Sequence, residues 1–335
     1  MAILITGGAG YIGSVTAAAL LERHEKIVIV DNLSRGHRTA VPVGARFYCG
    51  DIGDGNFIAM LCNRYRFDAV MHFSAFAYVG ESVAEPAKYY VNNVAETIQL
   101  LEKLLEAGIR HFVFSSTCAT YGEPEYLPID EKHPQRPTNP YGQSKLMIEQ
   151  VLSDLSAAGL LKYVALRYFN ACGATRSHGE FHLPETHLIP IVLEAAEGKR
   201  SAVPVYGNDY DTPDGTAIRD YIHVSDLARA HIAALDYLLS GGTSEAVNLG
   251  NGAGYSVLEV IESARRVTGR PIAVDFMPRR PGDPSRLIAD ARKAERLLGW
   301  RPGINSLDEM IASAYEWRQN NPDGYHHRGN TLAAD

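Results

Sequence analysis

Residues 3–21, ILITGGAGYIGSVTAAALL, join a short β-branched run to an apolar helix-forming segment through a turn with spaced glycines. In this context Gly7 permits a tight turn, Gly10 lets the backbone approach a pyrophosphate, and Gly13 allows the helix to pack closely on the strand. Backbone N–H groups at the start of the helix then face the anion. The segment predicts a dinucleotide-binding turn. The alternative is a turn that contains glycine only because its backbone needs positive φ angles.

Acidic residues after the second and third predicted strands bear on the kind of dinucleotide. Asp31 follows the run 26–30, where a carboxylate accepts hydrogen bonds from the adenosine ribose hydroxyls and repels a 2'-phosphate. This position favours NAD over NADP as the cofactor. Asp51 stands between Gly50 and Ile52 after the third strand, where it either reaches the adenine amine or makes a plain turn.

Short apolar, β-branched runs recur between amphipathic segments. They comprise residues 3–5, 26–30, 45–48, 69–73, 111–114, 163–168 and 246–249. Such runs suit a parallel sheet covered on both faces, and helical spacing lies between them, as in residues 95–105 before Gly108. We predict an α/β fold, namely a Rossmann-type doubly wound parallel sheet of about seven strands with a smaller, interleaved C-terminal α/β substrate lobe.

A change to loop-rich composition marks the second lobe. Gly, Pro, His and Asp are frequent from about residue 170 to 220, and Pro is frequent over 278–284. We therefore expect a dinucleotide-binding domain over residues 1–176, to which about 217–252 return, and a substrate lobe over residues 177–335. Residues 322–335 are expected to form a frayed tail.

Composition excludes several classes of protein. The 335 residues are 46% hydrophobic and 21% charged, which is typical of a globular chain. With 32 basic and 39 acidic residues, the net charge of -7 provides no bulk positive field for nucleic acid or an anionic membrane. The four cysteines are widely spaced and indicate no disulfide framework. No segment resembles a signal peptide or a membrane span, so we expect a cytoplasmic protein.

A second group of polar residues points to proton chemistry. The sequence NPYGQSK, residues 139–145, places Pro140 at a helix start and puts Tyr141 and Lys145 on one helical face. Tyrosine is a poor base at neutral pH, but a nearby ammonium and a cationic nicotinamide both favour the phenolate. Thr117, in FSSTCATYG at the end of the fifth strand, lies where open α/β sheets bind ligands. There it could share a proton with Tyr141 and a substrate hydroxyl.

Seven motifs follow one another along the chain, namely TGGAGYIGS, DNLSRG, FSSTCATYG, NPYGQSK, LRYFNACGA, GNDYDTPDGTAIRDYIHVSDLA and RRPGD. With these motifs the chain, from about residue 1 to 325, resembles the UDP-glucose 4-epimerase family of the extended short-chain dehydrogenases/reductases. The resemblance implies interconversion of UDP-galactose and UDP-glucose through a 4-keto intermediate, with Thr117, Tyr141 and Lys145 as catalytic residues. The NAD contacts that we take from the family motifs and the glycine-rich turn are Gly7, Gly10, Tyr11, Ile12, Gly13, Asp31, Asn32, Asp51, Ile52, Phe73, Ala75, Asn92, Tyr141, Lys145 and Tyr168.

The resemblance also implies contacts to the UDP-sugar, in addition to Thr117 and Tyr141. These are Asn170, His187, Leu188, Tyr206, Arg219, Arg280 and Asp283. Arg219 and Arg280 offer planar guanidinium groups to a diphosphate, Tyr206 either stacks on uracil or belongs to the core, and Asp283 could hold ribose hydroxyls. Leu287 matches the position where the family carries Tyr in members confined to plain hexoses and a small residue in members that accept N-acetylated sugars. Its intermediate size predicts partial acceptance of UDP-N-acetylglucosamine.

Three further expectations concern metal, cofactor retention and assembly. His178, His182 and His187 lack the Cys or Glu-His pairing of zinc sites, so no metal is expected. Ala77 replaces a Lys that reaches NAD in well-known bacterial members, which makes NAD retention less secure. The family forms a dimer through two long helices, and residues 89–107 and 140–158 would form that homodimer here.

Alternative functions remain open at this point. One is a 4-epimerase for other UDP-sugars, such as UDP-N-acetylglucosamine or UDP-xylose. Another is a nucleotide-sugar 4,6-dehydratase, but such enzymes place Asp-Glu after the active-site Thr, where Cys118 and Ala119 stand here. A third is a non-catalytic NAD-sensing protein on the same fold, which would not need the pair Tyr141 and Lys145.

Overall fold

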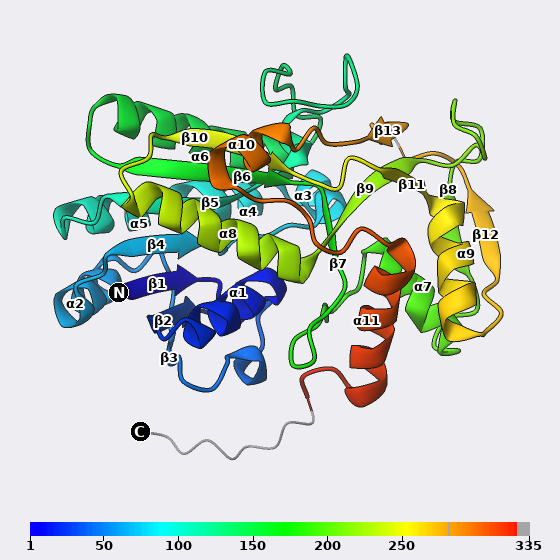
Figure 1. The fold of residues 1–335 in the computed structure, drawn as a ribbon, viewed down its shortest axis with the longest axis horizontal. Helices are drawn as coiled ribbons and strands as arrows, with labels where there is room; N and C mark the ends of the chain where they lie inside the picture. Colours follow the sequence, from blue (N-terminus) through cyan, green and yellow to red (C-terminus); the bar gives the residue numbers. More distant parts are fainter. Residues whose placement is uncertain (281, 327–335) are drawn as a thin grey trace.

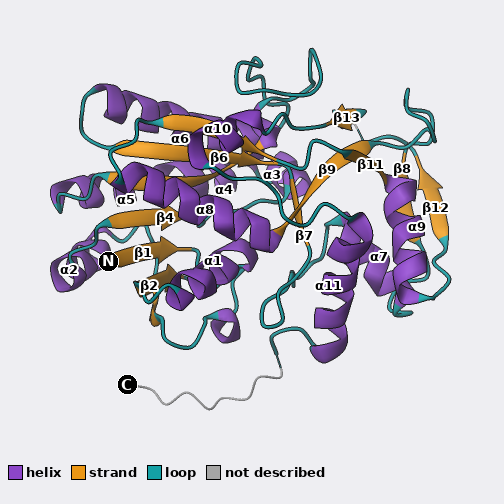
Figure 2. Ribbon diagram, viewed as in Figure 1, coloured by secondary structure: helices purple, strands orange, loops and turns teal. Residues whose placement is uncertain are grey.

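The computed structural model describes residues 1–280 and 282–326 and is built on one central sheet (Figures 1 and 2). All neighbouring strands of this sheet are parallel, in the order β10-β6-β5-β4-β1-β2-β3. The strands are β1 (Ala2–Thr6), β2 (Lys26–Asp31), β3 (Arg46–Cys49), β4 (Ala69–His72), β5 (His111–Thr117), β6 (Lys162–Tyr168) and β10 (Glu245–Leu249). The predicted doubly wound sheet of seven strands is confirmed.

Helices cover both faces of this sheet because its strands are apolar on both sides. On one face, Ile3 and Ile5 pack in a core with α1 (Tyr11–Glu22), α8 (Val224–Leu239) and α10 (Arg292–Leu298). On the other face, Leu4 packs in a core with α2 (Gly55–Tyr65), α5 (Glu96–Glu106) and α6 (Pro140–Ala157). Figure 1 shows α1 and α8 side by side over one face. The connection from β4 to α5 is also helical, through α3 (Val79–Ala84), α4 (Pro86–Tyr90) and the π-helical turn Val91–Ala95.

A second lobe, at the right of Figure 1, has its own small sheets and core. In one sheet β9 (Ile218–His223) pairs with β7 (Asn170–Cys172), β11 (Gly254–Ser256) and β13 (Arg286–Leu287). The other sheet consists of β8 (Val203–Tyr206) and β12 (Val274–Met277). The helices of this lobe are α7 (Leu188–Ala196), α9 (Val257–Thr268) and α11 (Leu307–Asn320).

The chain passes between the lobes at points that differ from the expected boundaries. β7 already pairs with β9, so the chain leaves the central sheet before residue 176. The expected returning segment, about 217–252, begins with β9, which also belongs to the small sheet. The return starts at α8, which packs on α1, and is completed by β10, which pairs with β6. The polar residues at the ends of β7 and β9 therefore lie at the junction of the two lobes.

The expected frayed tail, residues 322–335, is ordered where the structure describes it. Tyr325 is buried, its ring stacks on His37 at 5.2 Å, and its carbonyl accepts a hydrogen bond of 2.7 Å from Thr39 Oγ1. These contacts explain why residues 322–326 are held against the body of the protein. Residues 327–335 lie outside the described residues. Among the helices of the described part, none is both long and apolar enough to cross a membrane.

Candidate active site

The glycine-rich turn after β1 has room for backbone only. Gly7 has a φ of +72°, and a Cβ on it would lie 2.5 Å from Ser74 N. A Cβ on Gly13 would lie 2.4 Å from Gly7 O, so any larger residue there would push the helix away from the turn. Gly10 is the N-cap of α1 and makes no side-chain cap. The first N–H groups of this helix are therefore available to an anion, as the sequence predicted for a pyrophosphate.

Asp31 ends β2 next to this turn and is buried. Its Oδ2 accepts a hydrogen bond from Ala9 N at 3.0 Å and its Oδ1 accepts one from Leu33 N at 2.8 Å. Burial raises the pKa of the carboxyl, and the two backbone hydrogen bonds lower it in part. The carboxylate therefore holds the turn in place. It also lines a cavity at the end of the sheet.

An open cavity lies at the carboxyl ends of β1, β2 and β4. Predicted cofactor residues that line it are Gly7, Gly10, Asp31, Asn32, Ile52, Phe73, Ala75 and Asn92. Lining residues outside the predicted set are Ser34, Arg35, Gly36, Gly50, Ser74, Phe76 and Glu96. Ser34, Arg35 and Gly36 belong to the motif DNLSRG, so this motif could have indicated them as cavity residues. Burial and the nearby Asp51 raise the pKa of Glu96 to about 7, a perturbation that no sequence motif indicates.

Other predicted cofactor residues do not line this cavity. Tyr11 donates its hydroxyl hydrogen bond to Gly173 O across the lobe junction, and Ile12 packs against the core. Asp51 accepts hydrogen bonds from Gly53 N at 2.8 Å and Asn32 Nδ2 at 3.2 Å. Asp51 thus stabilises the turn after β3, and its contact with adenine stays a prediction. Tyr168 shares a hydrogen bond with the Ser115 hydroxyl.

Thr117, Tyr141 and Lys145 lie at the carboxyl end of β5 and the first turns of α6. Thr117 is the last residue of β5, and α6 starts at Pro140 with Asn139 Oδ1 capping Gly142 N. Burial raises the pKa of Tyr141, a neighbouring Tyr168 raises it further, and a hydrogen bond with Thr117 lowers it in part. The structure thus brings Thr117 and Tyr141 together, as their places in the sequence predicted.

Lys145 lies on the same helix face but is held by the backbone of β5. Its ammonium donates to Ser115 O at 2.8 Å and lies 4.9 Å from the centre of the Phe114 ring. Burial lowers the pKa of Lys145 to about 7, while Glu149 one turn further along α6 raises it. In this structure the ammonium is fixed on a carbonyl, and the pKa of Tyr141 is raised by burial. The expected lowering of the Tyr141 pKa by Lys145 is therefore not seen in these contacts.

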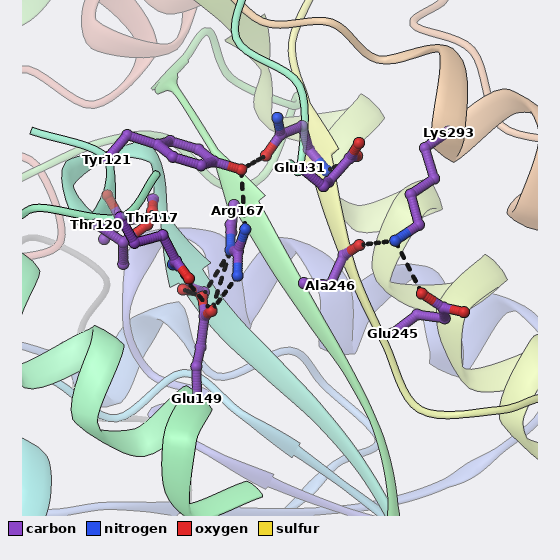
Figure 3. Close-up of polar contacts among 12 residues, drawn as sticks. Thr117, Thr120, Tyr121, Glu131, Glu149, Arg167, Glu245, Ala246 and Lys293 are labelled. Carbon is purple, nitrogen blue, oxygen red and sulfur yellow. Dashed lines mark hydrogen bonds and ion pairs between the residues drawn. The ribbon is translucent and has the colours of Figure 1, made fainter. Parts of the chain in front are cut away.

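Behind these residues lies a buried polar network (Figure 3). Arg167 Nε donates to both carboxylate oxygens of Glu149, at 3.0 and 3.1 Å. Arg167 also donates to the Tyr121 hydroxyl at 3.0 Å, and Ser116 donates to Glu149 at 2.5 Å. Figure 3 shows Thr117 beside this network. Because both charges are buried and paired, the network fixes β5, β6 and α6 relative to one another.

The predicted sugar-nucleotide residues gather on β8, β9 and the loop before β13. Arg219 donates to the Asp283 carboxylate, and the Arg280 guanidinium lies 3.7 Å from the centre of the Tyr206 ring. Arg219 is also near enough to Cys118 to lower the pKa of that thiol, which burial raises to about 12. Asn170 donates to Asp220 O at 3.0 Å. Because Cys118 directly follows Thr117, Arg219 lies near the end of β5.

His187 and Leu188 lie where α7 begins, with His187 as its N-cap. His187 Nδ1 lies 2.8 Å from Glu180 and 3.3 Å from Glu185, and His182 shares the same two carboxylates. Burial lowers the pKa of His187, but these carboxylates outweigh it and raise the pKa to about 10. Our expectation of no metal rested on the lack of Glu-His pairing, and that reasoning is wrong, because the loop folds both Glu side chains onto His182 and His187.

Comparison with known proteins agrees with this geometry. Residues 3–250 match the NAD dependent epimerase/dehydratase family, and the chain belongs to that family. A UDP-glucose 4-epimerase of Lacticaseibacillus casei is 50% identical over 327 residues, covering 97% of this chain and 99% of the relative. A crystal structure of a UDP-glucose 4-epimerase superposes with a TM-score of 0.95 at 47% identity, covering 97% of this chain and 99% of that one. The enzyme from Brucella ovis in complex with NAD gives 0.91 at 49% identity, covering 94% and 97%.

Proposed function

We propose that this protein is an NAD-dependent UDP-glucose 4-epimerase, which interconverts UDP-galactose and UDP-glucose. The observation that carries the proposal is the meeting of Thr117 and Tyr141 at the end of β5, in the same sheet as the turn after β1 in which a Cβ at Gly7 or Gly13 would clash. The relatives of about 50% identity that carry this activity in their names support the same conclusion.

The residues around the glycine-rich turn fit NAD. A Cβ at Gly7 or Gly13 would fill the space between the turn and its neighbours, and Asp31 lines the cavity at the position suited to ribose hydroxyls. NAD held there would supply a reversible hydride acceptor for C4 of the sugar. Arg35 supplies a cationic side chain in this cavity, whereas Ala77 is small and exposed.

The proton chemistry falls to the side chains at the end of β5. In our proposal, Tyr141 takes the proton of the sugar C4 hydroxyl and later gives it back, while Thr117 holds the same oxygen by a hydrogen bond. Lys145 is a positioning residue on β5 in the described structure, and we assign it the further role of orienting the nicotinamide ribose. Arg219, Arg280, Tyr206 and Asp283 would hold the nucleotide end of the substrate.

One assay tests substrate, reaction and retained cofactor together. Purified protein is incubated with UDP-galactose without added NAD, and UDP-glucose and NADH are both followed. We expect UDP-glucose to form without net NADH. Stoichiometric NADH would instead identify a dehydrogenase, and a 4-keto-6-deoxy sugar would identify a dehydratase. The dehydratase is disfavoured because the Cys118 thiol, with its pKa raised to about 12 by burial, is a weak acid at neutral pH.

The assembly we propose is a homodimer formed by residues 89–107, which include the π-helical turn and α5, and residues 140–158, which include α6. Helices α3, α4 and α6 pack against one another, and they carry exposed apolar side chains: Val79 and Val83 on α3, Val91 after α4, and Met147 on α6. Light scattering on Val91→Glu should give a monomer where the wild type gives a dimer. We also place the protein in the reducing cytoplasm, since Cys49, Cys62, Cys118 and Cys172 are all free thiols.

A further inference from the structure

Four side chains from the loop between β7 and α7 converge on one point. They are Glu180, His182, Glu185 and His187, and one ligand atom from each lies within 4.8 Å of all the others. His182 Nδ1 lies 3.4 Å from Glu180 Oε1 and 3.7 Å from Glu185 Oε2. His187 Nδ1 lies 2.8 Å from Glu180 Oε1 and 3.3 Å from Glu185 Oε1.

The contacts between imidazole nitrogen and carboxylate oxygen are close to the edge length of a tetrahedral metal site. With zinc bonds to imidazole nitrogen and carboxylate oxygen of about 2.0–2.2 Å, neighbouring ligand atoms stand about 3.3–3.6 Å apart. The four imidazole–carboxylate contacts, from 2.8 to 3.7 Å, lie around that value, although Glu185 faces His187 through Oε1 and His182 through Oε2. With one ligand atom from each residue, all four atoms lie within 4.8 Å of one another, so a rotation of the Glu185 carboxylate would bring one oxygen to a shared metal. Two imidazoles with two carboxylates form a donor set that suits a divalent first-row transition metal.

Hydrogen bonding within the loop does not account for the same arrangement. An imidazole Nδ1 carries at most one N–H and can donate fully to one carboxylate, yet each Nδ1 here stands between two. Both Nδ1 atoms are buried from solvent, and neither makes an aligned hydrogen bond with a described residue. The carboxylates are largely buried as well. Without a metal, the protonated imidazoles of His182 and His187, whose pKa values the carboxylates raise, balance their charge, and a divalent ion would take over that role.

We propose that Glu180, His182, Glu185 and His187 bind one Zn²⁺ ion through both Nδ1 atoms and one oxygen of each carboxylate. Four protein ligands leave no open position, which is the mark of a structural rather than a catalytic zinc site. Backbone N–H groups of Thr186 and His187 donate to Glu185 Oε1, each at 2.8 Å, and orient that carboxylate. His187 then keeps only Nε2 for any contact with the sugar nucleotide.

The site would fasten the substrate lobe to the cofactor side. Arg35, which lines the cofactor cavity, donates to Leu183 O at 3.2 Å, and His37 Nε2 lies 3.0 Å from Phe181 O. Tyr78 places its ring edge-on to His182, with centroids 5.8 Å apart. Fixing residues 180–187 on zinc therefore also holds the loop that follows Asp31.

Metal content of untagged protein tests the proposal directly. Wild type and the controls His24→Asn and Glu102→Gln, both at exposed positions, should contain about one zinc per chain by mass spectrometry of the metal. His182→Asn and Glu185→Gln should retain little of it, with affinity in a competition with a zinc-binding dye lowered at least the roughly 10- to 100-fold seen when even an outer partner is lost. Stripped wild type that binds zinc no more tightly than His182→Asn would overturn the proposal.

A second measurement guards against variants that fail to fold. Stripped wild type loaded with Co²⁺ should show the intense visible absorption of a tetrahedral centre, and thermal unfolding should shift upward when zinc is restored. Weak octahedral absorption with no shift in the unfolding temperature would rule out a closed four-ligand site. Neither readout depends on epimerase activity, so a failed activity assay leaves this test unaffected.

Discussion

Leu287 lies opposite Arg219 in the parallel pairing of β13 with β9. The same leucine packs against a buried cluster that contains Cys118, Tyr121 and Phe169. Cys118 directly follows Thr117, so Leu287 links the nucleotide-binding strand to the proposed reaction centre. A side chain in this position is well placed to limit the size of the sugar.

We expect slow epimerisation of UDP-N-acetylglucosamine, increased by Leu287→Ala and suppressed by Leu287→Tyr. A few apolar pocket atoms change discrimination by about 1–3 kcal/mol, so the change should be graded. The measurement is the ratio of kcat/KM for UDP-N-acetylglucosamine and UDP-galactose in the three proteins. An unchanged ratio in both variants would remove Leu287 from the pocket.

Tyr141→Phe should lower the rate by about 10²- to 10⁴-fold, because the variant lacks the group that moves the C4 hydroxyl proton. Cofactor content and the unfolding temperature should stay close to wild type, since the ring is retained. Tyr126→Phe, at an exposed position, is the matched control and should keep full activity. Near wild-type turnover of Tyr141→Phe would mean that another group acts as the base.

Asp31→Ala should weaken NAD binding and reduce the preference for NAD over NADP, because the ribose acceptor and the repelling charge are lost together. It also removes the acceptor for Ala9 N and Leu33 N, so some loss of stability is expected. Asp31→Asn keeps an acceptor oxygen and removes only the charge. Titration of both nucleotides into the three proteins separates these effects, and an unchanged preference in both variants would contradict the role of Asp31.

Lys145→Met should abolish most activity, and its effect on stability should depend on pH. Burial lowers the pKa of Lys145 to about 7 in the folded protein, against about 10.4 for an unperturbed lysine. Between these values the unfolded chain binds the extra proton, so wild-type stability rises with pH by up to about 1.4 kcal/mol per unit relative to the variant.

Urea unfolding of the nucleotide-free proteins, from about pH 7 to about pH 10, measures this slope. The free energy of unfolding of the variant, relative to that of wild type, should be highest near pH 7 and should fall as the pH rises. For Lys132→Met, at an exposed position, the free energy of unfolding should change with pH as it does in wild type. If Lys145→Met also showed the pH dependence of wild type, the folded protein would not disfavour the charged ammonium.

Residue patterns within short stretches of the sequence determined much of the site. The turn around Gly7, Gly10 and Gly13 follows a strand and opens a helix, and its function depends on neighbours within a few residues. The strands are readable because apolar runs buried on both faces differ from the amphipathic helices between them. Tyr141 and Lys145 share a helical face for the same local reason.

The tertiary structure decided contacts between segments far apart in the chain or without a regular period. Glu149 and Arg167 form a buried ion pair because α6 lies on β6, which no spacing along the chain reveals. Glu180, His182, Glu185 and His187 are close in sequence, but they occupy an irregular loop, where no period of 2 or 3.6 residues fixes which side chains meet. Sequence patterns report periodic local structure, whereas the closure of a loop and the docking of one lobe on another depend on packing throughout the fold.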